Sequence, residues 1–482
     1  MSKKGFYITT TLPYVNAAPH IGFALEIVQA DVLARYHKEF LGEELFFNTG
    51  TDEHGLKIYR KALEEGKDPQ AYTDEYAPKF DKLKSALHLS YTHFVRTTDE
   101  HHVRAAQELW RRCASRGDIY EKNYKGLYCV GDEMFLKDSD LVNGKCPNHP
   151  TMDPVEVEEK NYFFRLSAYQ EKLLAYLSKD GAVIPERRRR EATQFVENGL
   201  EDFSVSREKA RLSWGVPVPE DETQVMYVWF DALTNYISTL GWPEDAEGSY
   251  KKFWENGVVV QTAGKDQVRF QSIMWQAMLM SAGVKTTDMI VYHGHITSGG
   301  QKMSKSVGNV IDPFEIVEKY GTDALRYWLL REMPTFEDGD FTLERFEESY
   351  NANLANGLGN LVSRVIKMAS TSGVEAPKSP DIGNDPAFNL FKKYLDTFEI
   401  KKAADCIWQR IADADKKIDE TKPFKLVKEK PEEAKKILGD LLKEVQAIAF
   451  MLKPFLPETS EKAAEALRRL ELAQPLFPRI EK

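Results

Sequence analysis

The stretch from Pro13 to Phe23 contains groups that suit the binding of phosphate. It holds His20, whose imidazole can donate a hydrogen bond, and Gly22, which leaves the backbone accessible. An apolar pattern with helical spacing starts directly after His20, so we expect both residues at the N-terminus of a helix. Backbone N–H groups at such an end attract phosphate oxygens. The alternative is purely structural, with His20 only capping the helix.

A second stretch, residues 300–306, has the sequence Gly-Gln-Lys-Met-Ser-Lys-Ser. It places Lys302 and Lys305 beside serine hydroxyls, on a loop that begins with glycine. We expect a mobile cationic clamp for a polyphosphate, which would stabilise the charge on a departing pyrophosphate. The alternative is a solvated turn that happens to be rich in lysine. The two stretches together indicate chemistry on a nucleotide.

Strands and helices must hold these two stretches in place. Short apolar runs typical of buried strands occupy residues 6–10, 45–47, 257–262 and 289–292. Helical patterns lie between them, and this alternation predicts a Rossmann-like α/β fold with a parallel sheet. Ligands in such folds bind at the carboxyl ends of the strands. His20, Asp52 and His54 fall at that end.

The pattern of residue types changes at two further places in the sequence. Short-strand material rich in turns and aromatic residues begins near residue 119, which indicates a module inserted into the sheet domain. Strand patterns stop after about residue 342, and helical periodicity continues to the end of the chain. We therefore expect two halves of a catalytic domain (1–118 and 212–344), an insertion (119–211) and an all-α C-terminal domain (345–482).

Two motifs carry a resemblance to a known family. Residues 20–23 resemble the HIGH signature, and residues 302–306 match the KMSKS signature, of class I aminoacyl-tRNA synthetases. More specifically, the chain resembles the methionyl-tRNA synthetase family from about Gly5 to about Pro457. The supporting segments are residues 48–55, 227–233, 264–266 and 293–295. One departure is Phe23, which stands at the fourth position of the first signature, where the family has histidine.

The resemblance implies an activity and its reactants. ATP and L-methionine would form methionyl-adenylate and pyrophosphate, and the methionyl group would pass to the matching tRNA with release of AMP. The attacking carboxylate is already ionised, so the protein must position it and stabilise charge on the phosphates. Mg²⁺ would be held largely by the phosphates. The C-terminal helical bundle would read the anticodon.

The resemblance also assigns roles to residues by position. The catalytic residues would be His20, Gly22, Phe23, Lys302 and Lys305. ATP would be bound by His20, Gly22, Gly264, Lys265, Asp266, Lys302, Ser304 and Lys305. Methionine would be bound by Leu12, Tyr14, Asp52, Trp229, Leu233, Tyr236, Gln267 and Gln271. The anticodon would be bound by Asn360, Arg364 and Phe424. Asp52 would pair with the α-ammonium group of the amino acid, and the aromatic side chains would surround the thioether.

Four positions of the predicted substrate and tRNA sites depart from the family. If Phe23 replaces a hydrogen-bond donor, a transition-state contact worth roughly 2–3 kcal/mol is lost. Gln271 stands where relatives have histidine and Gln267 where an aliphatic residue is common. Extra amides favour looser selectivity, because one methylene is worth only about 1–3 kcal/mol. Phe424 replaces a tryptophan and would stack more weakly on a splayed base.

The insertion contains residues with the spacing of a zinc site. Cys129, Asp132, Cys146 and His149 follow the pattern C-x₂-D…C-x₂-H. It resembles the four-ligand zinc knuckle of the family's connective insertion, with aspartate where zinc-bearing relatives have cysteine. Zinc accepts carboxylate oxygen, although structural sites are mostly sulfur and imidazole. The alternative is a site that has lost its metal.

Composition sets the remaining limits. The chain has 482 residues and a net charge of −10, which argues mildly against a nucleic-acid partner, although binding follows local patches such as residues 187–190. That basic run is itself more typical of a solvated helix face. Four cysteines, no 18-residue apolar run and no signal-peptide pattern predict a cytoplasmic protein without a membrane span. A monomer is expected.

Two rival functions stay open. Another class I synthetase for an apolar amino acid is disfavoured, because those for valine, leucine and isoleucine need a larger editing insertion than residues 119–211 provide. A catalytically silent tRNA-binding paralogue is conceivable because of Phe23 and Gln271. The chain retains side chains that catalysis would need, which argues against a silent paralogue; they are His20, Asp52, Lys302 and Lys305.

Overall fold

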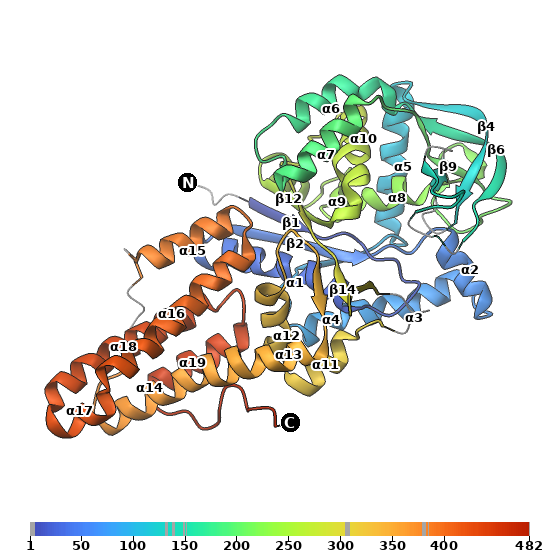
Figure 1. Cartoon of the computed structure of the whole chain (residues 1–482). Coiled ribbons are helices and arrows are strands. Elements are labelled where there is room, and N and C mark those ends of the chain that lie inside the picture. The colour runs from blue at the N-terminus through green and yellow to red at the C-terminus, as the bar shows by residue number, and fades with distance from the viewer. Residues whose placement is uncertain are drawn as a thin grey trace. The chain divides into compact units, whose positions relative to one another are not determined.

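The computed structural model describes residues 5–130, 134–136, 140–147, 150, 152–303, 309–377, 382–383 and 385–481. Their packing forms two units, whose elements are labelled in Figure 1. Unit 1 combines residues 1–19, 42–82 and 91–292, and unit 2 combines residues 20–41, 83–90 and 293–482. Both units are therefore assembled from segments that are distant in the sequence.

A six-stranded sheet organises unit 1, with the strand order β3-β2-β1-β12-β13-β7. The strands are β1 (Gly5–Thr9), β2 (Glu44–Thr51), β3 (His93–Arg96), β7 (Val183–Ile184), β12 (Val258–Gly264) and β13 (Met289–His293). The central strand β1 is wholly buried and pairs in parallel with both β2 and β12 (Figure 1). The pairs β2–β3 and β13–β7 are also parallel. The expected parallel α/β fold is confirmed.

The inserted module differs from the short strands expected there. β4 (Ile119–Cys129) and β6 (Val155–Phe164) form a long antiparallel pair, with Ile119 opposite Phe164 at one end. Ion pairs across these strands, such as Lys160 to Glu121 at 2.6 Å, support the solvent face. Opposite charges on neighbouring strands stabilise a sheet, which explains why a stretch rich in polar residues extends so far. β5 (Met134–Leu136) and β8 (Phe203–Ser204) flank this pair.

Helices of unit 1 carry several of the predicted site residues. They are α2 (Leu56–Glu64), α3 (Pro69–Asp81), α5 (Glu100–Ser115), α7 (Glu186–Glu197), α8 (Val228–Leu233), α9 (Asn235–Ser238) and α10 (Trp275–Ala282). The helical segment between β12 and β13 is not a single α-helix, since Phe270–Met274 forms a π-helix before α10. α3 begins as its sequence predicts, because the Asp68 carboxylate accepts hydrogen bonds from the Gln70 and Ala71 amides and Pro69 follows.

Unit 2 begins with α1 (Ile21–Arg35), which continues as a π-helix over Tyr36–Phe40. A fully buried guanidinium, that of Arg326 on α12 (Thr322–Tyr327), holds its segments together. It pairs with Asp31 on α1 at 2.8 Å and donates to the carbonyls of Leu87, Pro454 and Phe455. One arginine thus joins three stretches of unit 2 that the sequence separates.

The rest of unit 2 is helical after β16 (Gly339–Phe341), the last strand of the described chain, as expected. Its helices include α13 (Leu343–Ser349), α14 (Asn360–Thr371), α15 (Pro386–Asp396), α16 (Ile400–Thr421), α17 (Pro423–Glu429), α18 (Pro431–Met451) and α19 (Pro457–Arg469). Figure 1 shows α14, α16 and α18 packed together as a bundle. None of the helices in the described ranges has the length and apolar character needed to cross a membrane.

Candidate active site

His20 caps the N-terminus of α1, and this fixes how its imidazole is protonated. Its Nδ1 accepts a hydrogen bond of 3.1 Å from the Gly22 amide. A ring nitrogen that accepts carries no proton, so Nε2 holds the proton in the neutral ring and can act as a donor. A Cβ at position 22 would lie 2.9 Å from His20 Cε1, closer than real atoms approach. Glycine at 22 is therefore what allows the ring to cover the helix end.

The backbone of the same helix end differs from the expectation. We expected its N–H groups to receive phosphate oxygens, but they have internal acceptors. The Ile21 amide donates to the carbonyl of Ile311 at 3.0 Å, and the Phe23 amide donates to the carbonyl of His20 at 3.0 Å. Any contact with phosphate at this end would fall mainly to the His20 side chain. The capping role and a phosphate-binding role are compatible, because they use different ring nitrogens.

The lysine-rich stretch begins in a hairpin of unit 2. β14 (Ile296–Ser298) pairs with β15 (Gln301–Lys302) in antiparallel fashion and with β16 in parallel fashion. The Asp340 carboxylate anchors the turn, because it accepts hydrogen bonds from the Gly300 amide and the Thr297 hydroxyl, each at 2.7 Å. The side chain of Lys302 and the whole of Ser304 and Lys305 lie outside the described residues, so the expected clamp stays a prediction.

The hairpin and the start of α1 are close to one another within unit 2. A Cβ added to Gly22 would lie only 3.6 Å from Cε of Met303, which follows β15. A carboxylate oxygen of Glu26, on α1, also lies 2.9 Å from Nε2 of His293, which is buried at the end of β13. Gly294 follows, and a side chain there would collide with the Glu337 carbonyl, whose oxygen would be 2.0 Å away. The motif His-Gly-His therefore marks a close crossing of two backbone segments.

Residues predicted to bind methionine are brought together in unit 1. Tyr14 and Asp52 form an isolated parallel bridge beyond the ends of β1 and β2. The Asp52 amide donates to the carbonyl of Pro13 at 3.0 Å, and the Val15 amide donates to the carbonyl of Asp52 at 3.3 Å. Leu12 is half-buried in the same segment. These bonds fix the predicted α-ammonium acceptor, Asp52, against the predicted aromatic wall, Tyr14.

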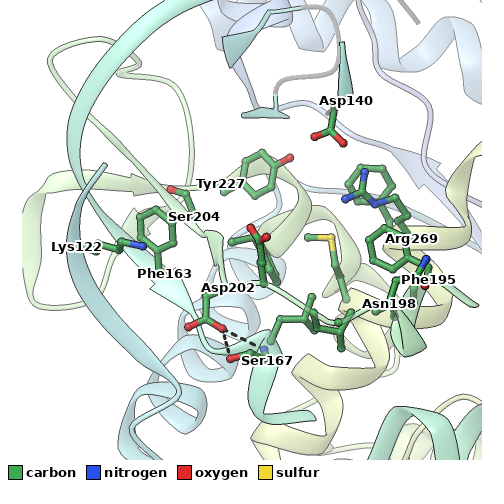
Figure 2. A pocket seen from close by; sticks show the side chains of 18 of the residues that line it. Lys122, Asp140, Phe163, Ser167, Phe195, Asn198, Asp202, Ser204, Tyr227 and Arg269 are labelled. Atoms are coloured by element: carbon green, nitrogen blue, oxygen red, sulfur yellow. Dashed lines mark hydrogen bonds between the residues drawn. The ribbon is translucent and has the colours of Figure 1, made fainter. Parts of the chain in front are cut away.

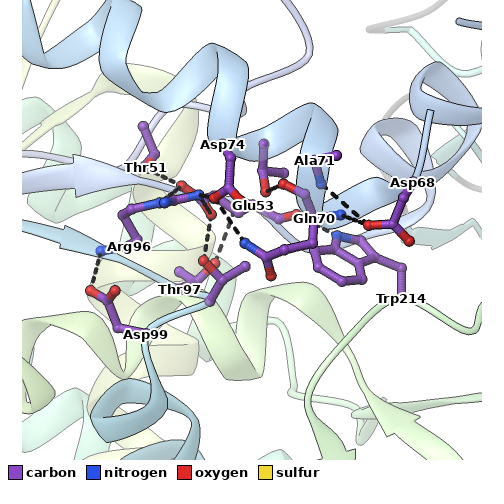
Figure 3. Close-up of polar contacts among 12 residues, drawn as sticks. Thr51, Glu53, Asp68, Gln70, Ala71, Asp74, Arg96, Thr97, Asp99 and Trp214 are labelled. Carbon is purple, nitrogen blue, oxygen red and sulfur yellow. Dashed lines mark hydrogen bonds and ion pairs between the residues drawn. The ribbon is translucent and has the colours of Figure 1, made fainter.

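The residue after Asp52 is Glu53, whose buried carboxylate binds several neighbouring side chains (Figure 3). Glu53 accepts two hydrogen bonds from Arg96, at 2.6 and 2.9 Å, and one from the Thr51 hydroxyl at 2.7 Å. Its backbone carbonyl accepts from the Trp214 indole at 2.6 Å. Arg96 also binds Asp74 on α3 at 2.6 Å. Burial alone would lower the pKa of Arg96, but its hydrogen bonds to the two carboxylates raise it, so the guanidinium stays positively charged.

The predicted thioether pocket contains two pairs of contacting side chains. The Trp229 indole stacks on Phe270, with ring centroids 3.8 Å apart and an interplanar angle of 15°. The Gln271 amide donates a hydrogen bond to the Tyr236 hydroxyl, and the Tyr7 hydroxyl donates to the backbone carbonyl of Tyr236 at 2.8 Å. Gln271 and Tyr236 are both almost fully buried. Gln271 therefore holds Tyr236, a predicted pocket residue, in position.

The predicted ATP-binding residues of unit 1 follow a strand. Gly264 is the last residue of β12, and Lys265 and Asp266 lie in the 3-10 turn behind it. The Gln267 side-chain amide donates a hydrogen bond to the Asp266 carboxylate at 3.2 Å. Leu233, which is predicted to bind methionine, is the last residue of α8 and is buried. The amide oxygens of Gln267 and Gln271 are buried without a hydrogen-bond partner among the described residues. Gly264 to Gln267 thus lie at the carboxyl end of β12.

A cavity of about 640 Å³ adjoins this region of unit 1 (Figure 2). It lies between the insertion and the helices behind β12, and it shares Tyr227 and Phe270 with the surroundings of Trp229. Figure 2 shows Asp202 bonded to Ser167, both at its edge. Arg207 stands over the Tyr227 ring at 4.5 Å. Lysine, arginine and aspartate all line the cavity, so its charges are mixed and indicate no single class of ligand.

Residues predicted to read the anticodon lie in the helical bundle of unit 2. Asn360 and Arg364 are on the first turns of α14, as expected. Arg364 faces two carboxylates of α16, those of Asp415 at 3.4 Å and Asp419 at 3.5 Å. Phe424 lies in the first turn of α17 and exposes 48% of its surface. An exposed aromatic ring has the access that base stacking requires.

Two of the four predicted zinc ligands are described, and they share one cluster. Cys129 and Cys146 are both buried and pack with Leu136. Asp132 and His149 lie outside the described residues. Among the residues that are described, no group of three or more potential ligands is placed to hold a metal.

The basic run of the insertion lies on α7. Arg188 pairs with Glu191, and Arg189 and Arg190 both pair with Glu186. Acids of the same helix offset these charges, which fits a solvated helix face better than a nucleic-acid contact.

The sequence did not reveal the buried polar partners around Asp52. The one sequence feature that could have indicated them is the pair of charged or polar residues, Glu53 and His54, directly after a buried strand. Asp231 is an acid inside the apolar run of α8, and it accepts from His54 at 2.7 Å. Burial alone would raise the pKa of Asp231, but His54 and His102 hold it below the ordinary value.

Comparisons with known proteins agree with these motifs. The family described as tRNA synthetases class I (M) matches residues 6–155 and 150–366. A methionine–tRNA ligase of Fusobacterium nucleatum is 39% identical, over 99% of this chain and 80% of the relative. That of Brucella suis is also 39% identical, over 97% of this chain and 92% of the relative.

Solved structures give the same result. Methionyl-tRNA synthetase of Mycobacterium tuberculosis in complex with methionyl-adenylate matches with a TM-score of 0.90 and 36% identity, covering 99% of this chain and 100% of that one. The apo form of the same enzyme matches with a TM-score of 0.83 and 32% identity, covering 100% and 99%. The chain belongs to the methionyl-tRNA synthetase family of class I.

Proposed function

We propose that this chain is a methionine–tRNA ligase. It would activate L-methionine with ATP to give methionyl-adenylate and pyrophosphate, and would then transfer the methionyl group to the matching tRNA with release of AMP. The observation that carries the proposal is the bridge between Tyr14 and Asp52, which places an aromatic residue and a carboxylate together beyond the carboxyl ends of β1 and β2. An apolar side chain and an α-ammonium group need partners of these two types. The hydrogen bond from Gln271 to Tyr236 orients a further aromatic residue of the predicted pocket.

The amino-acid end of the substrate has a matching partner. Asp52 supplies a carboxylate for the α-ammonium group, and its backbone bonds to Pro13 and Val15 keep it beside Tyr14. Trp229, stacked on Phe270, supplies an apolar wall for the side chain. The remaining residues of the predicted pocket complete this wall, and they are Leu12, Leu233, Gln267 and Gln271. The two glutamine amides make the pocket more polar than an aliphatic lining would.

The phosphates of ATP would be handled by residues of unit 2. His20 would donate from Nε2 to the α-phosphate, because Nδ1 is engaged by Gly22. Lys302 and Lys305, with Ser304, would stabilise the pyrophosphate as it leaves. Mg²⁺ would arrive with ATP and be held largely by the phosphates. Gly264, Lys265 and Asp266 would contact the nucleoside. Phe23 contributes no hydrogen bond from its side chain, so His20 carries more of the charge stabilisation.

The helical domain, residues 345–482, would bind the anticodon. Asn360 and Arg364 share one face of α14, and Arg364 is held by Asp415 and Asp419 rather than extended into solvent. These two carboxylates would orient the guanidinium toward a base. Phe424 would stack on a base that is turned out of the anticodon loop.

A structural zinc ion in the insertion is part of the proposal. The buried sulfurs of Cys129 and Cys146 in one cluster fit two of the four ligands of such a site. Asp132 and His149 would supply the other two. The ion would then fix the fold of the insertion and take no part in the reaction. We further propose a cytoplasmic monomer, divided into the catalytic, insertion and helical domains expected from the sequence.

Exchange of labelled pyrophosphate into ATP tests the proposed activation step. We expect exchange that depends on methionine and saturates with it. Exchange that depends instead on valine or leucine would favour another class I synthetase. No exchange with any amino acid, from protein that binds tRNA, would favour a silent tRNA-binding paralogue. In both cases the proposed function is wrong.

A further inference from the structure

A chain of buried hydrogen bonds connects three segments of unit 1. His54 Nδ1 lies 2.7 Å from one oxygen of Asp231, and His102 Nε2 lies 2.8 Å from the other. His102 Nδ1 in turn lies 2.9 Å from the Ser238 hydroxyl. The side chains of Asp231 and His102 are almost completely removed from solvent. Both oxygens of one carboxylate are thus used by imidazoles from different elements.

These residues lie beside the predicted methionine pocket at three points. His54 follows Asp52 by two residues at the end of β2. Asp231 lies on α8 between Trp229 and Leu233. Ser238 lies on α9, which also carries Tyr236. Only His102, on α5, is remote in sequence from every residue predicted to touch methionine.

The bonds constrain how the pocket elements are oriented. A hydrogen bond fixes both distance and direction, so Asp231 determines the rotation of α8 relative to the end of β2. α8 is short, and its residues 229 and 233 lie on either side of Asp231. A small rotation of the helix would therefore displace both predicted pocket residues. Burial makes the network costly to break, because a carboxylate that loses a partner has no water to replace it.

Asp231 is ionised in this environment. Burial alone would raise its pKa, but the charge and hydrogen bonds of His54 and His102 hold it below the ordinary value. An ionised carboxylate accepts from both imidazoles and makes stronger, shorter bonds than a neutral group would.

We propose that Asp231 is a positioning residue for methionine binding, which aligns α8 with Asp52 through His54 and is itself held by His102. The inference rests on the proposed function, since it concerns the same pocket. None of the three residues has to touch the substrate. Their loss should weaken methionine binding while leaving the binding of ATP unchanged.

Substitutions at the two histidines give a crossed test. Asparagine can place an N–H near the position of a histidine Nδ1, whereas glutamine places one near Nε2. His54 bonds to Asp231 through Nδ1, so His54→Asn keeps the bond and His54→Gln misplaces it. His102 uses Nε2, so His102→Gln keeps the bond and His102→Asn loses it. The four variants therefore form matched pairs of the same two side chains.

Methionine-dependent pyrophosphate exchange by the full chain is the readout, with KM measured for methionine and for ATP. We expect His54→Gln and His102→Asn to raise the KM for methionine by about tenfold. The KM for ATP and kcat should change by less than about twofold. His54→Asn and His102→Gln should stay near the wild type. Asp231→Asn should raise the KM for methionine at least as much as the disruptive histidine variants.

Asp118→Asn is the control for loss of a buried carboxylate. Asp118 is also buried in unit 1 and accepts from Tyr169 at 2.5 Å and Ser281 at 2.7 Å, but none of these residues belongs to the predicted pocket. It should leave the KM for methionine unchanged. Circular dichroism and thermal unfolding would establish that each variant is folded.

Several results would overturn the inference while the proposed function stands. They are an unchanged KM for methionine in all disruptive variants, equal effects of asparagine and glutamine at each histidine, a parallel rise in the KM for ATP, and an equal effect of Asp118→Asn. Absence of methionine-dependent exchange in the wild type is a different failure, because it overturns the proposed function and this inference together.

Discussion

The side-chain amide of Gln271 donates a hydrogen bond to the hydroxyl of Tyr236, and both groups are buried. The bond fixes the orientation of the Tyr236 phenol group within the predicted thioether pocket, because its oxygen accepts from the amide. A glutamine at this position can thus hold the tyrosine in place, and its presence does not argue against methionine as the substrate.

Removing this amide should weaken methionine binding. Gln271→Leu leaves the Tyr236 hydroxyl buried without its donor, and such a loss costs about 1–3 kcal/mol. We expect the KM for methionine in pyrophosphate exchange to rise by about five- to a hundredfold, with little change in the KM for ATP. Gln271→His, which keeps a donor, should stay within about threefold of the wild type.

The matched control is Gln224→Leu, because Gln224 is also a buried glutamine of unit 1, and it donates to the Lys160 carbonyl at 2.8 Å. It should not change the KM for methionine. Equal values for Gln271→Leu and the wild type would contradict the role assigned to the Gln271 amide.

Acid should destabilise unit 2 through Asp31. Burial alone would raise the pKa of Asp31, but Arg326 and Arg35 lower it below the ordinary value. A carboxyl group with a lowered folded pKa contributes stability above its unfolded pKa, about 3.9, and loses that contribution as the pH falls through the folded value. We expect this contribution to be constant above about pH 5, to decline as the pH falls below about 4, and to be lost once the pH lies below the lowered folded pKa.

Urea unfolding as a function of pH measures this effect. Asp31→Asn should lower stability at neutral pH, because the buried Arg326 then loses the carboxylate that it pairs with, and it should flatten the acid dependence. The same acid dependence in Asp31→Asn as in the wild type would show that other groups cause it.

The exposed ring of Phe424 should matter for tRNA and not for activation. Stacking of a base on an aromatic side chain is worth about 1–3 kcal/mol. Phe424→Ala should therefore lower kcat/KM for charging of tRNA by about five- to a hundredfold and leave pyrophosphate exchange unchanged. Phe424→Trp should retain or improve charging. Leu390→Ala is the control, since Leu390 is also an exposed apolar residue of unit 2, with 42% of its surface accessible.

Metal analysis of the purified protein tests the proposed zinc site. We expect about one equivalent of zinc, and less than about half an equivalent from Cys146→Ala. Cys406→Ala is the matched control, because Cys406 lies in α16, outside the insertion, and should leave the zinc content unchanged. Wild-type protein that holds less than about half an equivalent after purification without chelators would argue against the site.

Local patterns in the sequence predicted the main elements well. The apolar runs at residues 6–10 and 257–262 became the paired strands β1 and β12, because a buried parallel strand needs a continuous apolar sequence. Asp312 and Pro313 have the residue types that favour a helix start, and α11 (Pro313–Tyr320) begins there, where the Asp312 carboxylate accepts from the Phe314 amide. Both signals act over a few residues and can therefore be read locally.

Long-range polar pairing could not be predicted in this way. His54 and Asp231 are separated by 177 positions, and neither has neighbours that identify its partner. Arg326 reaches carbonyls at Leu87 and Pro454, which any residue type could supply. The capping bond of His20 also depends on the backbone of α1. Such contacts follow from tertiary packing, and local sequence patterns do not predict them.

Attachment of labelled methionine to tRNA by the purified chain, with ATP and Mg²⁺, tests the proposed function directly. We expect saturable charging of methionine-accepting tRNA, which is lost together with pyrophosphate exchange in Asp52→Ala and strongly reduced in His20→Ala. Charging with another amino acid, or tRNA binding with no charging at all, would show that the proposed function is wrong.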